Sequence, residues 1–447
     1  MATLWLVVAV AAAIQMIRLS TFAYDANRIG WSVLPTNPFY PTHFCFSGYY
    51  EGERFARAGD VNIYDPRQYA SEGCEDLMTC PERTIGPLKV DLYQYPPTFL
   101  IIPAAISMIT RDLLNARALW FLVQVLALAA AFVCTARWVG GSRGRIAVAL
   151  APVVFVALPT LAGLQLGNIQ ATTFAASMLA MVAIATRREA AGGMVLGLMI
   201  ASKMFPGLLA AWLVGALRWR AVAWTVIGIA ASGIAAFVIY GAKPFQDFAA
   251  YQAPRIASGE AFFWIDTPVS IPPNYGIHGL IAKLRLLGLT DAGREAGMLA
   301  SSVYGLLLSG IALLSGWQRR HVLSGSSEQL RMRLVVLWLA LLNLGSFRSP
   351  FVPDGYAAMG TVWLVTLLVA EGSERELSWR SLAPLGAIVP LSLIVDGFIP
   401  AQPPTWVIVL TLANQLLMLG INLWVVGREL LHARVSVPAS AVPARAV

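Results

Sequence analysis

Long apolar runs, separated by short polar segments rich in arginine, make up most of this chain. A helix needs about 20 apolar residues to cross the hydrocarbon core of a bilayer, with a working range of about 17–25. Uninterrupted crossings are therefore predicted near 3–22, 116–136, 145–163, 170–186, 221–240, 296–316, 356–371, 381–398 and 404–425. A shorter run covers 332–345, and two half-length runs fill 191–217 around a break at 202–206. The pattern predicts an all-α polytopic membrane protein with about twelve transmembrane helices.

Arginines gather in alternate loops, which predicts the orientation of the chain. These loops are 137–145, 187–189, 218–220, 317–333, 372–380 and the tail after Arg428. Because cytoplasmic loops carry an excess of Lys and Arg, we expect these loops and both termini to be cytoplasmic, in a plasma (inner) membrane. For the loops to alternate between the two sides in this way, the segment 95–110 cannot cross the membrane. We therefore expect this segment, which begins with Tyr95-Pro96-Pro97, to lie in the outer interface. The first run lacks a basic n-region, which favours a retained helix over a cleaved signal peptide.

The polar sequence is concentrated on the predicted outer side. A long first loop covers 23–115, and a second large loop covers 241–295. We expect a single integral-membrane domain over 1–430, followed by a disordered cytoplasmic tail at 435–447. The external loops, rather than the short cytoplasmic ones, are where we expect function.

Composition narrows the class further. Of the 447 residues, 57% are hydrophobic and only 13% are charged, whereas soluble domains carry roughly 25% charged residues. A soluble enzyme and a nucleic-acid binder are therefore excluded, despite the formal charge of +8. Much of that excess is explained by the arginines of the cytoplasmic loops, so the expected partner is the lipid bilayer.

Three of the four cysteines, Cys45, Cys74 and Cys80, fall in the first external loop. An oxidising compartment would allow a Cys74–Cys80 bridge, or a bridge from Cys45 to either of them, and buried free thiols are the alternative. A Cys-His zinc site is not expected, because four suitably spaced ligands are missing.

Acidic residues of the first loop are candidates for a general base. Asp25 follows the first crossing directly, and pairing with Arg28 is its simpler interpretation. An amphipathic helix is predicted from Tyr49 onward, with Tyr49 on its apolar face as a candidate acceptor contact. Glu51 and Glu53 point to different faces of that helix, so at most one of them faces a site. His43 is either a base or a structural histidine.

Two cations are candidates for binding a phosphate. Lys203 lies at the tip of the broken pair of half-length runs, where an ionisable residue is functional by default, although snorkelling to the interface is an alternative. Arg348 lies at an external helix end and suits a phosphate, unless it pairs with Asp354. Weaker candidates lie at other external helix ends. Their amide side chains suit either sugar hydroxyls or helix capping, and one histidine accompanies them: Asn168, Gln170, Asn274 and His278.

No nucleotide-binding loop, zinc signature or nucleophile elbow is present. This absence argues for an activated donor that is lipid-linked. Five short motifs then occur in order: Gly59-Asp60-Val61-Asn62-Ile63-Tyr64-Asp65-Pro66, Tyr95-Pro96-Pro97-Thr98-Phe99-Leu100, Gly167-Asn168-Ile169-Gln170, Ser202-Lys203-Met204-Phe205-Pro206 and Arg348-Ser349-Pro350. Over roughly 20–420 the chain resembles the GT-C glycosyltransferases, specifically glycosyltransferase family 87.

The resemblance implies a GT-C-like bundle and an inverting enzyme that uses a polyprenyl-phosphate sugar, often mannose, on the outer face. It also implies a first-loop aspartate as base, in an Asp-Phe/Leu-x-x-Tyr setting before the amphipathic helix. Here the setting begins His43-Phe44-Cys45-Phe46 and contains no aspartate. Asp25 is the first candidate for this role, and Glu51, Glu53 or His43 are the alternatives.

The sequence thus predicts a hexosyltransferase that moves a sugar from a polyprenyl-phosphate donor to an extracytoplasmic glycan or glycolipid. Lys203 and Arg348 would hold the departing phosphate, so neither a metal nor another cofactor is required. A polyprenyl-phosphate or glycolipid transporter is the main alternative, although ionisable residues gather at one face and no repeated halves are visible. An assembly or scaffold protein would explain the external loops but not Lys203.

Overall fold

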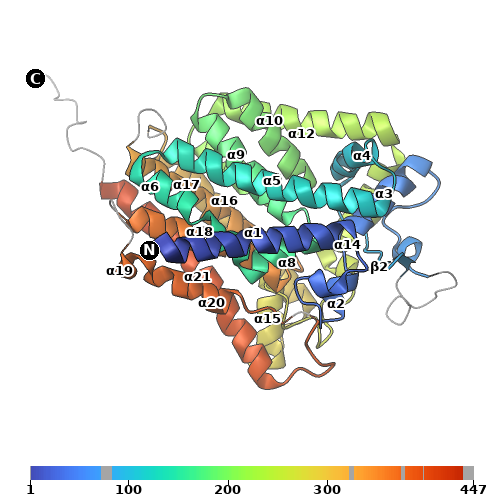
Figure 1. Ribbon diagram of the computed structural model, residues 1–447. Coiled ribbons are helices and arrows are strands. Elements are labelled where there is room, and N and C mark those ends of the chain that lie inside the picture. The colour runs from blue at the N-terminus through green and yellow to red at the C-terminus, as the bar shows by residue number, and fades with distance from the viewer. Residues whose placement is uncertain (1, 72–82, 322–326, 374–377, 396, 436–447) are drawn as a thin grey trace, which may run out of the picture.

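The computed structural model describes residues 2–71, 83–321, 327–373, 378–395 and 397–435, and they form a helical bundle (Figure 1). In this part of the chain the only sheet is a two-stranded antiparallel hairpin, formed by β1 (Thr84–Ile85) and β2 (Leu88–Lys89). The start of α1 and the end of α21 lie at one end of the bundle in Figure 1, and the first loop lies at the other. We call the latter the loop end.

Six helices are long and apolar enough to cross a membrane. They are α1 (Ala2–Tyr24), α5 (Leu113–Val139), α12 (Trp219–Tyr240), α16 (Arg294–Gln318), α18 (Asp354–Gly372) and α21 (Thr405–Val435). A bent unit raises the number to seven if it counts as one span: α6 (Gly141–Ala149), α7 (Ala151–Val156) and α8 (Leu158–Leu166). The integral-membrane character is as predicted, but the structure supports six to seven spans by length and composition rather than about twelve.

Two predicted crossings are not continuous helices. The run at 145–163 bends by 67° between α7 and α8, where Pro159 follows the break. The run at 381–398 contains only the short turns α19 (Trp379–Leu382), η6 (Ala383–Ala387) and α20 (Ile388–Leu391). Proline lacks a backbone donor and clashes with the preceding turn, so Pro159, Pro384 and Pro390 interrupt what an apolar count alone reads as a span.

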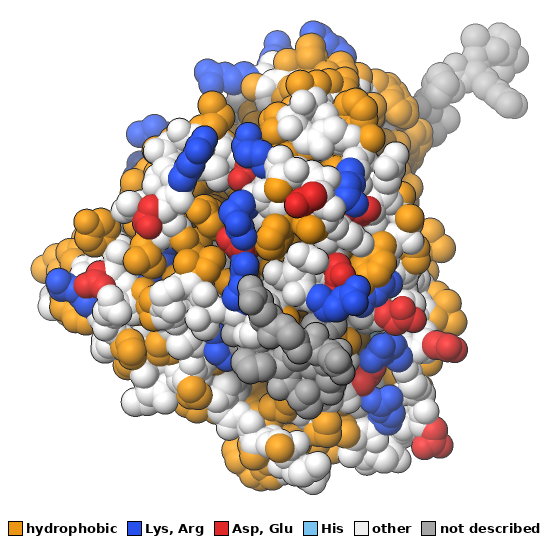
Figure 2. Space-filling view, turned by 90° about the vertical axis from the view of Figure 1, so that its right-hand side faces the viewer, with side chains coloured by type: hydrophobic (Ala, Val, Ile, Leu, Met, Phe, Trp, Pro, Cys, Tyr) orange, Lys and Arg blue, Asp and Glu red, His pale blue; other side chains and the backbone are white. Residues whose placement is uncertain are grey.

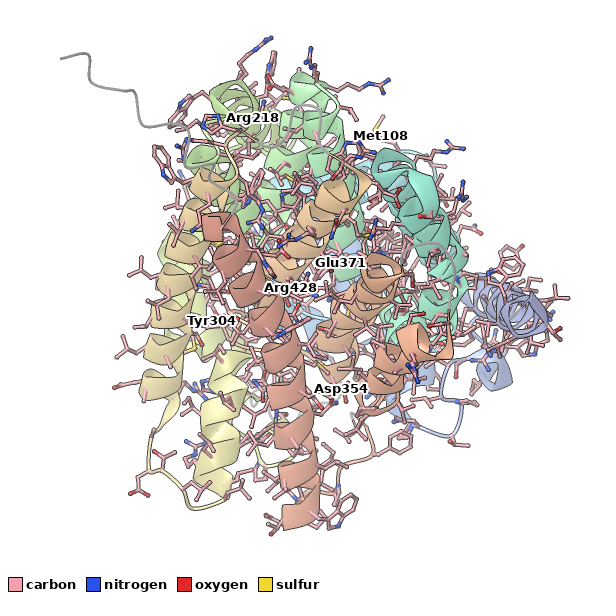
Figure 3. All side chains as sticks on the ribbon, turned by 90° about the vertical axis from the view of Figure 1, so that its left-hand side faces the viewer. Met108, Arg218, Tyr304, Asp354, Glu371 and Arg428 are labelled. Carbon is pink, nitrogen blue, oxygen red and sulfur yellow. The ribbon has the colours of Figure 1, made fainter. Side chains whose placement is uncertain are left out.

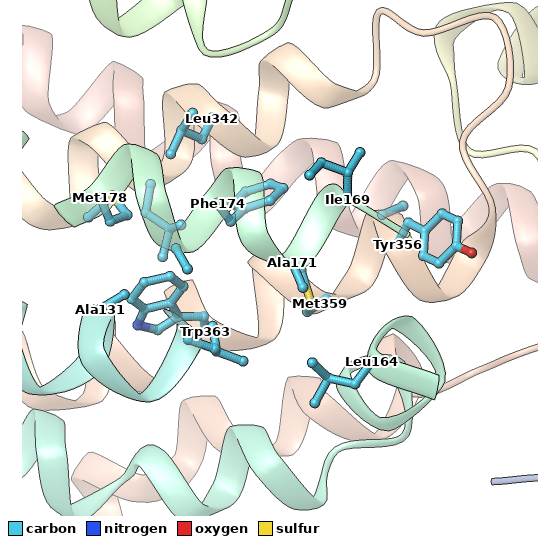
Figure 4. Packing of buried hydrophobic residues seen from close by; sticks show 14 of the residues in the cluster. Ala131, Leu164, Ile169, Ala171, Phe174, Met178, Leu342, Tyr356, Met359 and Trp363 are labelled. Carbon is cyan, nitrogen blue, oxygen red and sulfur yellow. The ribbon is translucent and has the colours of Figure 1, made fainter. Parts of the chain in front are cut away.

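Four helices pack inside the bundle without qualifying as spans: α9 (Gln170–Ala185), α10 (Glu189–Ser202), α11 (Gly207–Gly215) and α17 (Glu328–Ser346). Helix α17 is buried from Leu334 to Ser346 and contacts α18 and α21, so it lies in the core. Close packing of α9 and α18 is visible where Ile169, Phe174, Tyr356 and Met359 gather (Figure 4).

Short elements build the loop end. The first loop forms η1 (Ile29–Trp31), α2 (Phe39–Thr42), α3 (Phe46–Ala58), η2 (Pro66–Tyr69), β1, β2, η3 (Pro97–Leu100) and α4 (Ile101–Ser107). The second loop forms α13 (Lys243–Asp247), the π-helical turn η4 (Phe248–Gln252), α14 (Ala253–Ser258), η5 (Glu260–Phe262) and α15 (Ile277–Leu286). The predicted amphipathic helix corresponds to α3. The predicted interfacial segment 95–110 is a short helix that is not long enough to span.

Arginines join several helices at the end opposite the loop end. Glu429 of α21 is fully buried and pairs with Arg319, Arg333 and Arg428. Arg428 also pairs with Glu371 of α18, 2.7 Å away, and the two residues lie side by side in Figure 3. Loops that the sequence assigns to one side of the membrane therefore meet at one end of the bundle. The predicted tail at 435–447 lies almost entirely outside the described residues.

Candidate functional site

Charged side chains of both signs gather on the surface of the loop end, where they alternate with apolar ones (Figure 2). Below this surface, polar side chains from five separate segments form one connected group. We call it the Lys203 cluster, and its members are His43, Cys45, Tyr49, Asp91, Tyr95, Asn168, Gln170, Lys203 and Tyr356.

Lys203 carries the positive charge of the cluster. It caps the C-terminus of α10 in an extended conformation, directly before the break that Pro206 enforces. Its half-buried ammonium donates to Gln170 Oε1 at 2.7 Å and lies 3.4 Å from Asn168 Oδ1. Both partners are neutral, and among the described residues no carboxylate forms an ion pair with it. A half-buried cation that has only neutral partners is suited to binding an anion.

The two amides are held by the turn between α8 and α9. Gly167 ends α8 in the left-handed conformation at φ 67°, and Phe44 packs where a β-carbon would stand. Trp120 Nε1 donates to the Gly167 carbonyl at 2.7 Å, and Gln124 Nε2 donates to the Asn168 carbonyl at 2.6 Å. Asn168 also accepts from the Gln170 backbone N–H at 3.0 Å, in the turn that precedes α9. The N-cap of α9 is Ile169, so Asn168 supports this turn rather than capping the helix.

Asp91, His43 and Cys45 form the opposite part of the cluster. His43 Nε2 lies 3.3 Å from Asp91 Oδ2 and 3.7 Å from Cys45 Sγ. Cys45 is buried, and burial raises the pKa of its thiol well above the ordinary value. The Asp91 side chain is 31% exposed, so the carboxylate is open to a substrate. Asn168 connects the two parts, because its Nδ2 lies 3.6 Å from Cys45 Sγ.

The first loop folds so that Asp91 meets α3. The β1–β2 hairpin leads into Asp91, whose backbone N–H donates to Ser47 Oγ at 3.0 Å. Ser47 in turn donates to the Lys89 carbonyl at 3.0 Å. Gly48 makes this approach possible, since a β-carbon there would lie 2.7 Å from the Asp91 carbonyl oxygen.

Three tyrosines enclose the cluster. Tyr49 of α3 is buried, and its hydroxyl lies 3.0 Å from the Tyr95 hydroxyl and accepts from the Ile169 N–H at 3.3 Å. Tyr95 accepts from Asn168 Nδ2 at 3.4 Å, and its ring lies beside the Lys203 ammonium. Tyr356 of α18 places its hydroxyl 3.1 Å from Cys45 Sγ. Tyr49 therefore belongs to the cluster, and its contact with an acceptor stays a prediction.

The acidic candidates named from the sequence are engaged elsewhere. Asp25 is part of a surface pocket lined also by Thr21, Tyr24, Arg28, Asp112, Leu114 and Asn115. Its carboxylate lies 3.2 Å from Arg28 Nε, and none of its described contacts reaches Lys203. Glu51 is buried and pairs with Arg54 and Arg83. Glu53 is buried and pairs with Arg57, so all three acids already have cationic partners.

The remaining candidates lie around the second loop. Arg348 is exposed and packs along Gly305 of α16, and no described ion pair joins it to Asp354. Asn274 is buried and donates to the Pro350 carbonyl at 2.9 Å, which fixes a loop. His278 is buried and lies 3.1 Å from Asp266 Oδ1. None of the three has a described contact with a member of the Lys203 cluster.

Asp91 is the acidic member of the Lys203 cluster, and the sequence interpretation did not name it as a candidate. It occurs just before Tyr95-Pro96-Pro97 in an extended segment, where alternation would place Asp91, Tyr93 and Tyr95 on one side. That alternation is the signal that could have singled it out. Cys45 is a free thiol, and the predicted Cys74–Cys80 bridge lies outside the described residues.

A helical integral-membrane protein with a polar, cation-bearing cluster at one end of its bundle is the class that fold and site define. The model of glycosyltransferase family 87 matches residues 93–346, which is more than half of the chain. The chain therefore belongs to glycosyltransferase family 87, as its motifs suggested. Nothing in this match supports the transporter alternative. No curated protein and no solved structure matches the chain.

Proposed function

We propose that this glycosyltransferase moves a hexose, with mannose as the first candidate, from a polyprenyl-phosphate donor to a hydroxyl of a glycan or glycolipid. The observation that carries the proposal is Lys203, a half-buried cation held by Gln170 and Asn168 without an acidic partner. A phosphate supplies the missing negative charge. The break between α10 and α11 brings this cation to the end of an apolar helix, where the phosphate of a membrane lipid is available.

The transfer step uses both parts of the cluster. Asp91 accepts the proton of the acceptor hydroxyl, and His43 orients the carboxylate across their 3.3 Å contact. The acceptor oxygen forms a bond to the anomeric carbon while the bond from that carbon to the phosphate oxygen breaks. The electron pair of the breaking bond passes to the phosphate oxygen beside Lys203, and Lys203 stabilises the growing negative charge. A single displacement of this kind inverts the anomeric configuration.

We assign Asn168 and Gln170 to the sugar because both present amide groups beside Lys203. Asn168 also lies between Lys203 and Cys45. Arg348 is kept as a second phosphate contact only if the donor lipid extends along α16, where its guanidinium lies. We assign Asp91 as the base in place of Asp25, Glu51 and Glu53, because Asp91 is the one of these four acids that belongs to the Lys203 cluster.

We propose that the loop end faces the outside of the plasma membrane. The support is the gathering of arginines at the opposite end, since cytoplasmic segments are enriched in Lys and Arg. A lipid-linked donor also suits an outer site, because the chain carries no nucleotide-binding motif.

Replacing Gly48 with alanine tests how Asp91 is positioned. The new methyl group would meet the Asp91 carbonyl oxygen at 2.7 Å, so the carboxylate should move and turnover should fall about 10²-fold. Sugar transfer by the purified protein measures this effect. Gly30→Ala is the matched control in the same loop, because no atom lies within 4 Å of its β-carbon position. Equal activity of the two variants would contradict the assigned role of Gly48.

The proposed function is tested with purified protein, glycolipid acceptors and two kinds of radiolabelled donor. We expect transfer from polyprenyl-phosphate mannose, or from another polyprenyl-phosphate hexose, and none from nucleotide sugars. Transfer from nucleotide sugars alone would contradict the proposal. In proteoliposomes, movement of labelled donor lipid across the bilayer without any transfer would favour the transporter alternative instead.

A further inference from the structure

Three different metal-binding side chains converge beside the proposed acceptor position. The ligand atoms of His43, Cys45 and Asp91 all lie within 4.8 Å of one another, although the residues come from two distant segments. They supply one nitrogen, one sulfur and one oxygen. The sequence argued against zinc because it lacks four spaced ligands, but catalytic zinc sites use three protein ligands and keep the fourth position open.

We propose that His43, Cys45 and Asp91 form a zinc-binding site with an open fourth position, next to the Lys203 cluster's amide side chains. The three kinds of ligand atom indicate which class of metal would bind. Magnesium and calcium prefer oxygen ligands alone, whereas a mixed set of thiolate, imidazole and carboxylate suits zinc.

The spacing of the ligands fits this metal. Tetrahedral zinc with a Zn–S bond of about 2.3 Å and a Zn–N bond of about 2.0–2.1 Å holds sulfur and nitrogen about 3.6 Å apart. Cys45 Sγ and His43 Nε2 are 3.7 Å apart. A Zn–O bond of about 2.0–2.2 Å gives a nitrogen-to-oxygen separation of about 3.4 Å. His43 Nε2 and Asp91 Oδ2 are 3.3 Å apart, so two of the three ligand separations match tetrahedral zinc, and the third is within 4.8 Å.

The ligands are also held in place by their surroundings. The Cys45 N–H donates to the Leu166 carbonyl at 2.8 Å, and the Asp91 N–H donates to Ser47 Oγ at 3.0 Å. The ring of Phe39 stacks on the His43 ring, with centroids 4.2 Å apart. Tyr356 and Asn168 direct polar groups at Cys45 Sγ from 3.1 and 3.6 Å. Hydrogen bonds of this kind orient a coordinating sulfur and stabilise its negative charge.

The catalytic consequence rests on the proposed function. His43, Cys45 and Asp91 would hold the ion, which would supply Lewis-acid activation of the acceptor hydroxyl. The Asp91 oxygen that does not bind zinc would accept the proton, and His43 would hold Asp91 through the shared ion. The existence of the site does not rest on that function, and it is measured without any sugar donor.

The test is zinc binding by the purified full-length protein. After chelator treatment and addition of Zn²⁺, elemental analysis should find about one bound zinc per chain, and the melting temperature should rise. Co²⁺ in its place should show a thiolate-to-cobalt charge-transfer band. Cys45→Ser and His43→Ala should lose the band, and their zinc affinity should fall at least about 10-fold, because second-shell changes alone already cost that much. Size-exclusion chromatography in detergent checks that both variants remain folded.

Two controls decide where the metal sits. Cys134→Ser removes the other described free thiol, which lies in α5, and should leave zinc binding unchanged. The double variant Cys74→Ser/Cys80→Ser should also bind zinc normally. Loss of zinc in this double variant, or unchanged zinc and cobalt spectra in Cys45→Ser, would overturn the site. Transfer activity by the metal-free protein would overturn the catalytic role of zinc and leave the proposed function standing. Zinc binding without transfer from any lipid-linked donor would support the zinc site and contradict the proposed function.

Discussion

Lys203→Met is expected to weaken the binding of polyprenyl phosphate by about 10–100-fold, because a hydrogen bond to a charged group contributes about 1.5–3 kcal/mol. The variant keeps the length and apolar stem of the side chain and removes only the charge and its donors. Gln170 would lose its 2.7 Å partner as well. The expected loss in turnover is similar or larger, roughly 10²–10³-fold, since stabilisation of the leaving phosphate disappears during the reaction.

The measurement is a titration of the detergent-purified protein with a short-chain polyprenyl phosphate. Lys89→Met serves as the matched control, because Lys89 is an exposed lysine on β2 at the same end of the molecule and is not a member of the cluster. If the two variants bound the lipid phosphate equally well, Lys203 would not be the phosphate-binding group. Lys203→Arg should recover part of the affinity, because it restores the positive charge.

Asp91→Asn is expected to lower turnover by about 10²–10⁴-fold, the usual contribution of a general base. Asparagine preserves the shape of the side chain and its 3.0 Å backbone contact with Ser47. Donor affinity should change little, since Lys203 and its amide partners are untouched. Transfer rates at saturating donor measure the effect.

Asp25→Asn is the informative partner variant, because Asp25 is the base that the sequence favours. Its carboxylate is exposed beside Arg28, so we expect nearly normal transfer. A normal Asp91→Asn enzyme together with an inactive Asp25→Asn enzyme would reverse the assignment. Loss of activity in both variants would indicate that each substitution disturbs the folded first loop, rather than identifying one residue as the base.

The apolar runs predicted a helical membrane protein and located α1, α5, α12, α16, α18 and α21. They predicted about twelve crossings, more than the six to seven that the described helices support by length and composition, because a hydrophobic run does not reveal whether its helix is broken. Pro159 turns one run through a bend of 67°, and α17 is buried among other helices. Apolar surface that packs against protein and apolar surface that faces lipid look the same in a sequence.

The candidate site was predicted where local sequence carried the signal. The helix break singled out Lys203, and the turn after α8 singled out Asn168 and Gln170, which the structure joins by hydrogen bonds. Asp91 was not predicted from the sequence, because its partner His43 lies far away in the chain and a small hairpin brings the two residues together. Arg54 and Arg57 stand at helical spacing from Glu51 and Glu53, so these two pairs could have been predicted from the sequence. Arg83 is distant in sequence, and its pairing with Glu51 is not evident before folding.

The central claim is that one cluster contains two separable parts, a phosphate-binding cation at Lys203 and a proton acceptor at Asp91. Single-turnover transfer from polyprenyl-phosphate mannose, measured over a range of donor concentrations, tests it most directly. The account predicts that Lys203→Met raises the donor concentration needed for half-maximal rate, whereas Asp91→Asn lowers the maximal rate and leaves that concentration unchanged. Identical profiles for the two variants and the unaltered protein would contradict it.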